Sequence, residues 1–240
     1  MPIVSLQNIS KSFGKTPIIN NISLNFSKGK FICLLGSSGS GKTTILRLMA
    51  GLEKLDDGKI YLNGKLVNEK GRILIASSQR EIGFIFQDLA LWPHLTVYEN
   101  IAFGLKIKKA EKAKISAKIS EILDFFCIEG HQNKYPNQLS GGQQQLVAIA
   151  RSLVLNPQIL LMDEPLANLD VKLKSKIRNQ IKNLTKDFSI TIIYVTHDHH
   201  EAFKLADEIV IINDGKIVEI GAPEEIHKSE NTFVKEFIEI

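Results

Sequence analysis

A glycine-rich segment near the start of the chain has the composition and spacing of a loop that binds phosphate groups. It matches the pattern G-x-x-x-x-G-K-[ST]. Glycines let backbone N–H groups close around phosphate oxygens, because no Cβ obstructs the approach. We expect Lys42 to reach the β- and γ-phosphates of a nucleoside triphosphate and the Thr43 hydroxyl to ligate Mg²⁺. The residues expected to hold the nucleotide are Gly36, Ser37, Ser38, Gly39, Ser40, Gly41, Lys42, Thr43 and Thr44.

The segments on either side of this loop favour the same interpretation. The apolar run from Lys30 to Leu35 precedes it and is typical of a strand buried on both faces. A helical pattern from Thr43 to Ala50 follows it, and the positive end of such a helix favours an anion. The alternative, a surface turn rich in Gly and Ser, is disfavoured by this strand–loop–helix context.

Two adjacent carboxylates follow another apolar run later in the chain. The run from Ile159 to Met162 leads directly into Asp163 and Glu164. In enzymes with a phosphate loop, an Asp at the end of a buried strand holds the Mg²⁺ shell. A carboxylate beside it can polarise an attacking water, which is the task of a general base. The alternative is a solvated acidic turn, which the phosphate loop makes the weaker interpretation.

Composition limits the class of protein. With 44% hydrophobic and 23% charged residues, the 240-residue chain can build a sizeable core. The net charge of +4 is a mild excess without an Arg-rich stripe, so we expect no nucleic-acid partner. The two cysteines, Cys33 and Cys127, lack metal-ligand spacing, which fits a reducing compartment. No apolar run approaches the ~20 residues that cross a bilayer, so any service to a membrane would pass through partner chains.

Strand-like and helix-like runs alternate along the chain, which predicts a three-layer α/β fold. The segment from about Asp88 to Gln138 differs, because it lacks buried-strand runs and carries a helical pattern from Lys108 to Phe126. The predicted strands are Ile3 to Ile9, Ile22 to Phe26, Lys30 to Leu35, Ile159 to Met162, Thr191 to Val195 and Ile209 to Ile212. Predicted hairpin turns lie at Asp57-Gly58, Asn63-Gly64 and Asp214-Gly215.

Several ordered motifs resemble those of the ABC ATPases, from Val4 to about Phe237. Leu139-Ser140-Gly141-Gly142-Gln143 resembles the signature motif of that family. Gln87 resembles the Q-loop glutamine, and His197 resembles the switch histidine. The remaining matches are Leu169-Asp170, which resembles the D-loop, and Phe13, which falls where the family keeps an aromatic residue against adenine.

The resemblance implies a P-loop NTPase core with an antiparallel β subdomain and an inserted α-helical subdomain. It implies a single ABC ATPase domain over 1–240. The α/β core with the β subdomain would take residues 1–87 and 157–240, and the helical subdomain with the signature motif about 88–156. ATP and Mg²⁺ would be bound between two cassettes arranged head to tail, which favours a homodimer.

The resemblance also assigns roles to single residues. Glu164 would activate water, Gln87 would contact Mg²⁺ and that water, and His197 would hydrogen-bond the γ-phosphate. Taken alone, Gln87 and His197 would be ordinary surface residues, and Phe13 could equally be a packing residue. The catalytic set is Glu164, His197, Gln87 and Lys42, and the metal set is Thr43, Gln87 and Asp163. The residues expected to act on ATP bound by the other cassette are Ser140, Gly141, Gly142, Gln143 and Asp170.

The chain departs from the family pattern in three places. Leu146 replaces a residue that is usually basic, and Ala167 replaces a frequent Ser, whose lost hydrogen bond is worth ~1 kcal/mol. The stretch from Ala90 to Ile101 is similar to import cassettes for polyamines, sugars, iron or oxyanions. Many of those carry a further C-terminal regulatory domain, which we expect this chain, ending at Ile240, to lack.

We therefore expect a cytoplasmic ATPase on the inner face of the cell membrane that powers import. A groove between Asp88 and Asn100 would receive a coupling helix from membrane permease subunits, and a solute-binding protein would take part indirectly. The first alternative is an exporter or lipid-handling cassette of the same family. A non-transport ABC protein acting on DNA or ribosomes is a second, and a catalytically dead regulatory cassette a third. The last of these is disfavoured because the chain has Lys42, Asp163, Glu164 and His197.

Overall fold

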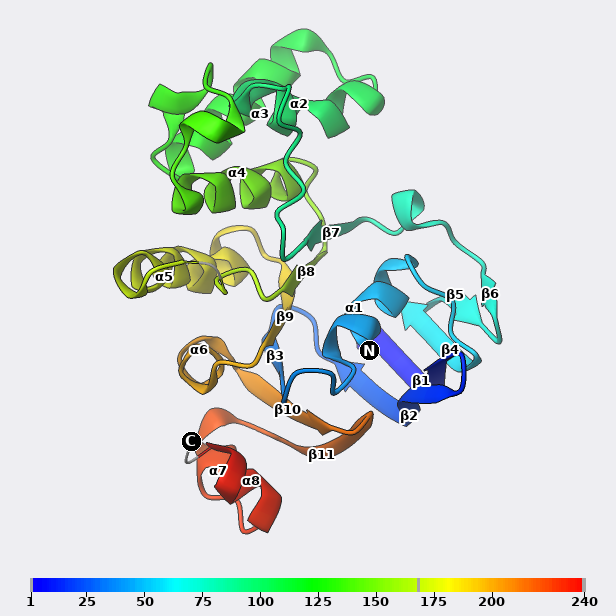
Figure 1. Cartoon of the computed structure of the whole chain (residues 1–240). Coiled ribbons are helices and arrows are strands. Elements are labelled where there is room, and N and C mark those ends of the chain that lie inside the picture. The colour runs from blue at the N-terminus through cyan, green and yellow to red at the C-terminus, as the bar shows by residue number, and fades with distance from the viewer. Residues whose placement is uncertain (1, 168, 239–240) are drawn as a thin grey trace.

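The computed structural model describes residues 2–167 and 169–238, so Asn168 of the D-loop-like segment, Met1 and the last two residues lie outside it. The centre of the fold is a six-stranded sheet in the order β11-β10-β3-β9-β8-β7 (Figure 1). Its neighbours pair in parallel except β10 and β11, which form a hairpin. The strands are β3 (Phe31–Leu35), β7 (Ile82–Ile85), β8 (Ile159–Asp163), β9 (Thr191–Thr196), β10 (Glu208–Asn213) and β11 (Lys216–Gly221).

A second sheet is antiparallel and has the order β2-β1-β4-β5-β6. Helix α1 (Lys42–Ala50) lies between the two sheets (Figure 1). Its apolar residues, Ile45 and Met49 among them, share one buried cluster with both sheets. The strands are β1 (Val4–Phe13), β2 (Thr16–Phe26), β4 (Asp57–Leu62), β5 (Lys65–Glu69) and β6 (Arg72–Ile73).

Alternating residues of β3 divide the interior into two cores. Ile32 and Leu34 face α1 and the antiparallel sheet. Phe31, Cys33 and Leu35 face the helices on the opposite side of the parallel sheet. Because successive strand residues point to opposite faces, the apolar run supplies both cores at once. The helices are α2 (Val97–Ile107), α3 (Lys112–Phe125), α4 (Gly141–Leu153), α5 (Val171–Asp187), α6 (His199–Leu205), α7 (Pro223–His227) and α8 (Thr232–Ile238).

Helices α2, α3 and α4 form a group of their own between β7 and β8, at the top of Figure 1. In the part of the chain that the structure describes, short 3₁₀ turns lie at Ser77–Gln79, Glu129–His131 and Pro136–Gln138. Within the described ranges, no helix combines the length and apolar character that crossing a bilayer requires.

The predicted strands are confirmed, and two of the three predicted hairpin turns are confirmed. Asn63-Gly64 joins β4 to β5, and Asp214-Gly215 joins β10 to β11. The turn at Asp57-Gly58 is wrong, because both residues belong to β4. Gly58 has φ of 93° and lies at a bulge against β1, where a Cβ would come within 2.5 Å of the Gln7 carbonyl oxygen. The glycine therefore serves a close backbone approach rather than a reversal of the chain.

The helical pattern from Lys108 to Phe126 is wrong at its start. Helix α2 ends at Ile107, Lys109 adopts a left-handed φ of 55°, and α3 begins only at Lys112. The missed start of α2 had a local signal. Thr96 and Glu99 form a capping box, in which each side chain accepts a hydrogen bond from the backbone N–H of the other.

Candidate functional site

Four neighbouring parallel strands end at one edge of the central sheet, and the predicted site residues follow them there. Gln87 comes after β7, Glu164 after β8, His197 after β9 and the phosphate loop after β3. Parallel strands bring their carboxyl ends to a common edge, where α/β proteins bind ligands. A pocket of about 640 Å³ opens at this edge and is lined by Phe13, Ile18, Ser37, Ser38, Gly39, Gly41, Lys42, Thr43, Thr44, Gln87, Glu164 and His197.

The phosphate loop depends on its glycines for its shape. Gly39 and Gly41 have φ of 81° and 100°, a region that L side chains avoid. A Cβ on Gly41 would come within 2.6 Å of Ile19 Cδ1 and 2.9 Å of the Ile18 carbonyl oxygen. A Cβ on Gly36 would overlap the backbone of Ile212. The loop therefore keeps its backbone N–H groups open to an anion only with glycine at these positions.

The Lys42 ammonium is held inside the loop by neutral partners. Its Nζ donates hydrogen bonds to the carbonyl oxygens of Gly36 (2.8 Å) and Ser37 (2.7 Å). Burial lowers the pKa of Lys42, against the opposing pull of the Glu164 and Asp163 carboxylates. A positive charge kept away from water at the centre of an N–H cradle is suited to a phosphate group.

The three residues expected to hold a metal lie together. The Thr43 hydroxyl donates a hydrogen bond of 2.7 Å to Asp163 Oδ1, whose side chain is buried. Burial raises the pKa of Asp163, and the Thr43 hydrogen bond opposes that rise. An adjoining pocket of about 430 Å³ contains Thr43, Gln87 and Asp163, together with Arg47, Phe86 and Asp88. Hydroxyl, amide and carboxylate oxygens are the donors that Mg²⁺ prefers, so these residues fit the ion.

Glu164 reaches the pocket because the chain turns sharply after β8. Its φ is 45°, a left-handed value, and its N–H donates to the Val195 carbonyl oxygen at 3.0 Å. Adjacent strand residues would otherwise point to opposite faces of the sheet. The turn brings Glu164 Oε2 within 3.1 Å of His197 Nδ1, so the carboxylate and the imidazole face the pocket as a pair. Residues other than glycine rarely adopt this conformation, and such strained residues cluster at functional sites.

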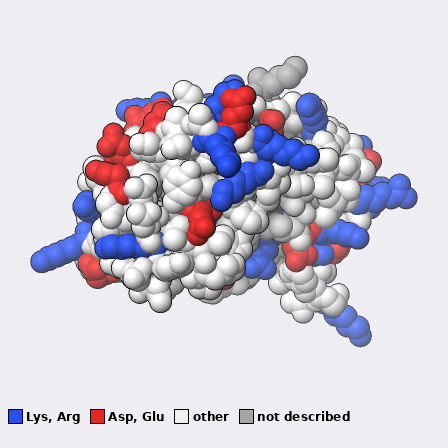
Figure 2. All heavy atoms as spheres, turned by 90° about the horizontal axis from the view of Figure 1, so that it is seen from above, with Lys and Arg blue, Asp and Glu red and all other residues white. Residues whose placement is uncertain are grey.

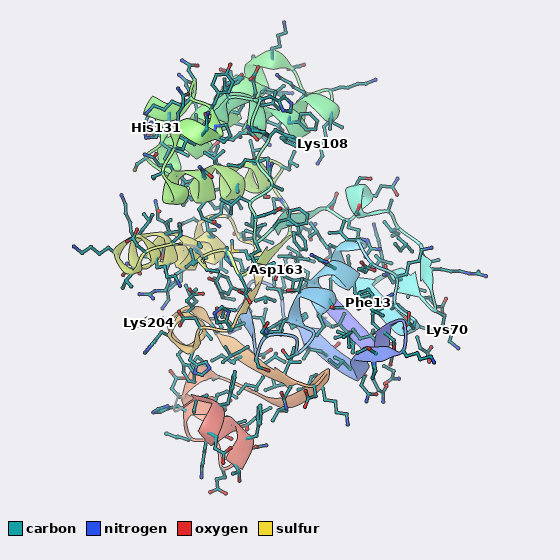
Figure 3. All side chains as sticks on the ribbon, viewed as in Figure 1. Phe13, Lys70, Lys108, His131, Asp163 and Lys204 are labelled. Atoms are coloured by element: carbon teal, nitrogen blue, oxygen red, sulfur yellow. The ribbon has the colours of Figure 1, made fainter. Side chains whose placement is uncertain are left out.

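Phe13 lines the pocket and is 49% exposed as a residue, and the Lys11 ammonium is 5.1 Å from its ring centroid. Figure 3 labels Phe13 on β1 and Asp163 at the end of β8. An exposed ring offers a face on which a base can stack. The sequence did not single out Ile18, which also lines the pocket and follows Phe13 across the β1–β2 hairpin.

The five residues expected to act on the nucleotide of the other cassette lie outside this pocket. Ser140 begins α4, where it forms a capping box with Gln143, and its side chain is exposed. Gly142 packs so closely on Leu173 that a Cβ would clash with that side chain. Asp170 begins α5 by accepting a hydrogen bond from the Leu173 N–H at 3.0 Å. The residues of this group are Ser140, Gly141, Gly142, Gln143 and Asp170. Gly36, Ser40 and Asp163 are also absent from the lining of this pocket, and Asp163 lines the adjoining one.

The departure at Leu146 has a packing explanation. Leu146 is 7% exposed and belongs to the buried cluster that joins α4 to its neighbours. A leucine fits that position without the desolvation cost of a charged side chain. Ala167 is half-buried.

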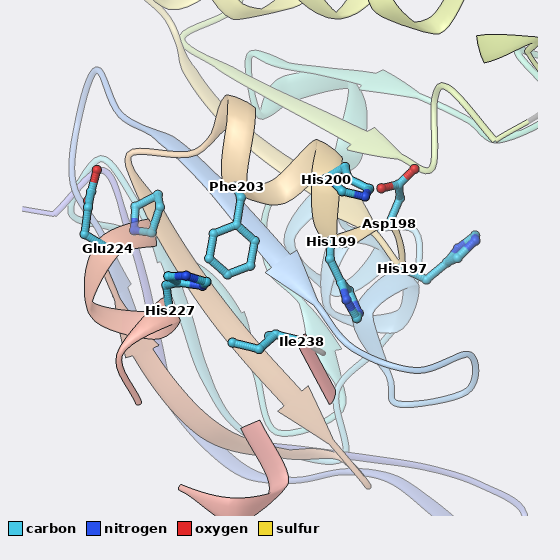
Figure 4. A pocket seen from close by; sticks show the side chains of 9 residues that line it. His197, Asp198, His199, His200, Phe203, Glu224, His227 and Ile238 are labelled. Carbon is cyan, nitrogen blue, oxygen red and sulfur yellow. The ribbon is translucent and has the colours of Figure 1, made fainter. Parts of the chain in front are cut away.

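A third pocket, of about 730 Å³, shares His197 with the first. Figure 4 shows His197 projecting away from Phe203 and His227, which lie on the far side of this third pocket. Burial lowers the pKa of His199, which packs on the Phe237 ring with centroids 4.6 Å apart. His197 thus lines both this pocket and the pocket that holds the phosphate loop.

Taken together, the strand–loop–helix and the carboxylates at the ends of neighbouring parallel strands define the P-loop NTPase class of nucleotide-binding proteins. Comparison with known proteins narrows the class. A family profile described as "ABC transporter" matches residues 19–167. The chain belongs to the ABC transporter family, among its ATP-binding proteins.

Three curated relatives have import functions in their names. A probable sulfate/thiosulfate import ATP-binding protein, CysA of Chlorella vulgaris, is 45% identical over 98% of both chains. The Fe(3+) ions import ATP-binding protein FbpC of Escherichia coli K12 is 44% identical over 94% of this chain. The spermidine/putrescine import ATP-binding protein PotA of Clostridioides difficile is 44% identical over 98% of this chain and 67% of its own. The present chain spans only 63% of the length of FbpC.

Solved structures show the same fold. The dimeric, post-hydrolysis ATP-binding cassette MJ0796, bound to ADP and Pi, matches with a TM-score of 0.80 and 34% identity over 92% of this chain and 98% of that one. The cassette cbiO1 of Clostridium perfringens, part of the ABC transporter complex cbiONQ, matches with a TM-score of 0.86 and 28% identity over 98% of this chain and 94% of that one.

Replacing the buried carboxylate Asp163 should make the protein more stable. An acid whose pKa is raised by folding loses stability as the pH rises above its ordinary value, here 3.8. Asp163→Asn removes this charge while its Oδ1 can still accept from Thr43. We expect the free energy of unfolding at pH 7 to rise by about 1 kcal/mol, which is typical of substitutions that remove an unfavourable group from an active site. Urea denaturation at pH 7 and pH 4 measures it.

The advantage of the asparagine should shrink towards pH 4, where the wild-type carboxyl becomes protonated. Asp124→Asn, at an exposed position on α3, is the matched control and should show no such pH-dependent gain. An equal or lower stability of Asp163→Asn at pH 7 would contradict the argument from burial.

Proposed function

We propose that this protein is the ATP-hydrolysing subunit of an ABC transporter and powers import through a separate membrane permease. One observation carries the proposal: a phosphate loop, the Thr43–Asp163 pair and the Glu164–His197 pair line connected pockets. Relatives at 44–45% identity that are named import ATP-binding proteins support the direction of transport. The mixture of acidic and basic side chains on the face in Figure 2 fits a protein that does not bind nucleic acid.

In this proposal the loop residues bind the triphosphate and Phe13 stacks on the base. Lys42 exchanges its hydrogen bonds to the loop carbonyls for phosphate oxygens, which compensate better for its buried charge. Thr43, Asp163 and Gln87 would hold Mg²⁺. Bound Mg²⁺ would supply charge neutralisation at the β- and γ-phosphates.

Glu164 orients the attacking water and accepts its proton. The water oxygen forms a bond to the γ-phosphorus while the bond from that phosphorus to the β–γ bridging oxygen breaks, which gives ADP and phosphate. His197, whose Nδ1 lies 3.1 Å from Glu164 Oε2, fixes the carboxylate and donates to the γ-phosphate. Both residues directly follow strands of the buried sheet, so little reorganisation accompanies the reaction.

We further propose that two copies act together, each contributing Ser140, Gly141, Gly142, Gln143 and Asp170 to the nucleotide on the other. The exposed hydroxyl of Ser140 and the adjacent glycines sit at the N-terminus of the 13-residue helix α4, which favours an anion. They do not line the pocket of their own chain, which leaves them free to complete another. The dimeric state of cassette MJ0796 supports this arrangement.

The permease would dock on the surface at residues 88–100, with residues 88–156 acting as a helical subdomain on the core. Pro93 and His94 are exposed there, beside the partly buried Leu91 and Trp92. The protein would then be cytoplasmic and peripheral on the inner face of the cell membrane. A solute-binding protein would take part through the permease rather than through this chain.

Replacing Glu164 tests the assignment of the general base. In Glu164→Gln the amide keeps the shape but accepts no proton, so we expect ATP hydrolysis to fall by about 10²–10⁴-fold. Phosphate release by the purified protein measures this, and binding of a fluorescent ATP analogue should persist. The exposed Glu236→Gln is the matched control and should hydrolyse at the wild-type rate. Unchanged hydrolysis by Glu164→Gln would remove Glu164 from the catalytic set.

Replacing Ser140 tests the contribution of a second copy. Ser140→Arg, combined with Glu164→Gln so that ATP persists, places a bulky cation on the proposed cap. We expect unchanged nucleotide affinity, because Ser140 lies outside its own pocket, but loss of the ATP-dependent dimer measured by light scattering. The control Ser116→Arg, at an exposed position on α3, should still dimerise. A dimer that forms normally with Ser140→Arg would exclude the two-sided site.

A substitution in the proposed docking surface tests the permease contact. Pro93→Arg adds a large charged side chain at an exposed position, so we expect it to prevent co-purification with co-expressed permease subunits. ATP hydrolysis by the isolated cassette should not change, because Pro93 is absent from both nucleotide pockets. Asn25→Arg, exposed on β2, is the control that should still bind. Normal transport by Pro93→Arg would count against this surface.

A further inference from the structure

Arg151, in the last turn of α4, binds the segment that follows Gln87. Its two terminal nitrogens donate hydrogen bonds to the carbonyl oxygens of Ala90 (2.6 Å) and Leu89 (2.7 Å). Both bonds are short and charge-assisted, and the planar guanidinium fits two adjacent acceptors at once. Arg151 is absent from the lining of both nucleotide pockets. Its contacts therefore serve the position of the backbone after Gln87 rather than the ligand directly.

The backbone that Arg151 binds is in an unfavourable conformation. Leu89 and Ala90 have φ of 60° and 45°, so two consecutive residues with a Cβ occupy the left-handed region. L residues other than glycine, asparagine and aspartate rarely adopt it, and a surrounding structure must impose it. The pair of hydrogen bonds from Arg151 is a contact that does so. Loss of the guanidinium would let this segment relax.

The same guanidinium also stacks on an aromatic side chain of this region. The Arg151 Cζ lies 4.9 Å from the Trp92 ring centroid, and the Trp92 ring packs on Phe103 of α2 with centroids 4.3 Å apart. The fully buried Asn100 accepts from the Trp92 N–H and donates to the Trp92 carbonyl oxygen. Arg151 thus connects α4, the segment after Gln87 and α2 in one continuous set of contacts.

Helix α4 carries this connection to a distant point. It has 13 residues and is therefore about 20 Å long, with Ser140 capping its first turn and Arg151 in its last. Near its end, the Ser152 hydroxyl also donates to the Phe84 carbonyl oxygen of β7 at 3.3 Å. One end of a rigid element is therefore bound to the strand and loop that carry Gln87, and the other end presents Ser140.

We propose that Arg151 is a positioning residue that transmits nucleotide occupancy at Gln87 along α4 to Ser140. Gln87 lines the pocket of its own chain, whereas Ser140 lies outside that pocket. Under the proposed function, on which this inference rests, Ser140 caps the nucleotide held by the second copy. Arg151 then makes the position of Ser140, which caps the nucleotide of the second copy, depend on whether the pocket of its own chain is occupied. The two binding sites are thereby coupled through one rigid helix.

The test compares Arg151→Met with wild type and with Arg178→Met. Methionine keeps the apolar length of the side chain and removes every donor. Arg178 on α5 is a matched arginine, half-buried, that touches neither nucleotide pocket. We expect Arg151→Met to bind a fluorescent ATP analogue with wild-type affinity but to hydrolyse ATP about tenfold more slowly, the size of effect that loss of coupling produces. Arg178→Met should match wild type in both assays.

Trp92 is the only tryptophan of the chain, so its fluorescence reports on the segment that Arg151 holds. In the Glu164→Gln background, Mg-ATP should change the Trp92 emission and produce a dimer. Adding Arg151→Met should abolish both responses while the analogue still binds. Arg151→Lys keeps the charge but loses the planar pair of donors, so we expect an intermediate response.

Three outcomes would overturn the inference. The first is turnover and ATP-dependent dimerisation at wild-type levels in Arg151→Met. The second is a loss of nucleotide affinity in proportion to the loss of turnover, which would indicate a merely structural role. If Arg151→Met does not fold, Arg151→Lys decides, because a Lys variant equal to wild type in turnover and in Trp92 response would exclude the mechanism. Absence of ATP hydrolysis in the wild-type protein would instead contradict the proposed function itself.

Discussion

The parallel register of four neighbouring strands is the constraint on which the rest of the structure depends. Because β7, β8, β9 and β3 run in the same direction, their carboxyl ends meet at one edge, and the residues that follow them share one space. These residues come from positions as far apart as Gly36 and His197. The sheet can hold them rigidly because its strands are buried on both faces, between α1 on one side and α5 and α6 on the other.

The site keeps two opposite charges buried with neutral partners. Lys42 contacts backbone carbonyls, and Asp163 contacts a hydroxyl, while burial shifts the pKa of each towards the neutral form. Neither arrangement is the most stable for the free protein, since a charge removed from water is stabilised best by an opposite charge. A magnesium–triphosphate complex offers an anion to the lysine and a cation to the aspartate. Under the proposed function, this unfavourable burial would favour the binding of a ligand that carries both charges.

The order of chemistry-bearing motifs was readable from the sequence because each lies at the junction of a buried strand and a turn. The apolar runs predicted the strands, and the resemblance supplied Gln87 and His197, which are unremarkable as single residues. Interactions between distant segments were not readable. Gly58 looked like a turn residue because its partner at the bulge, around Gln7, lies some fifty positions away. The boundary between α2 and α3 near Lys109 was missed because one helical pattern was read across it. No sequence pattern marked Ile18 as a pocket residue.

The contact between Gly142 and Leu173 has a mechanical consequence. Leu173 belongs to α5, the helix that Asp170 begins, and Gly142 belongs to the first turn of α4, which Ser140 begins. Because Gly142 has no Cβ, the first turns of α4 and α5 pack in direct contact. The first residues of the two helices therefore form one continuous surface. A neighbouring molecule would meet that surface as one unit. Any larger residue at Gly142 would wedge the helices apart and misalign both starts at once, even if every polar group remained intact.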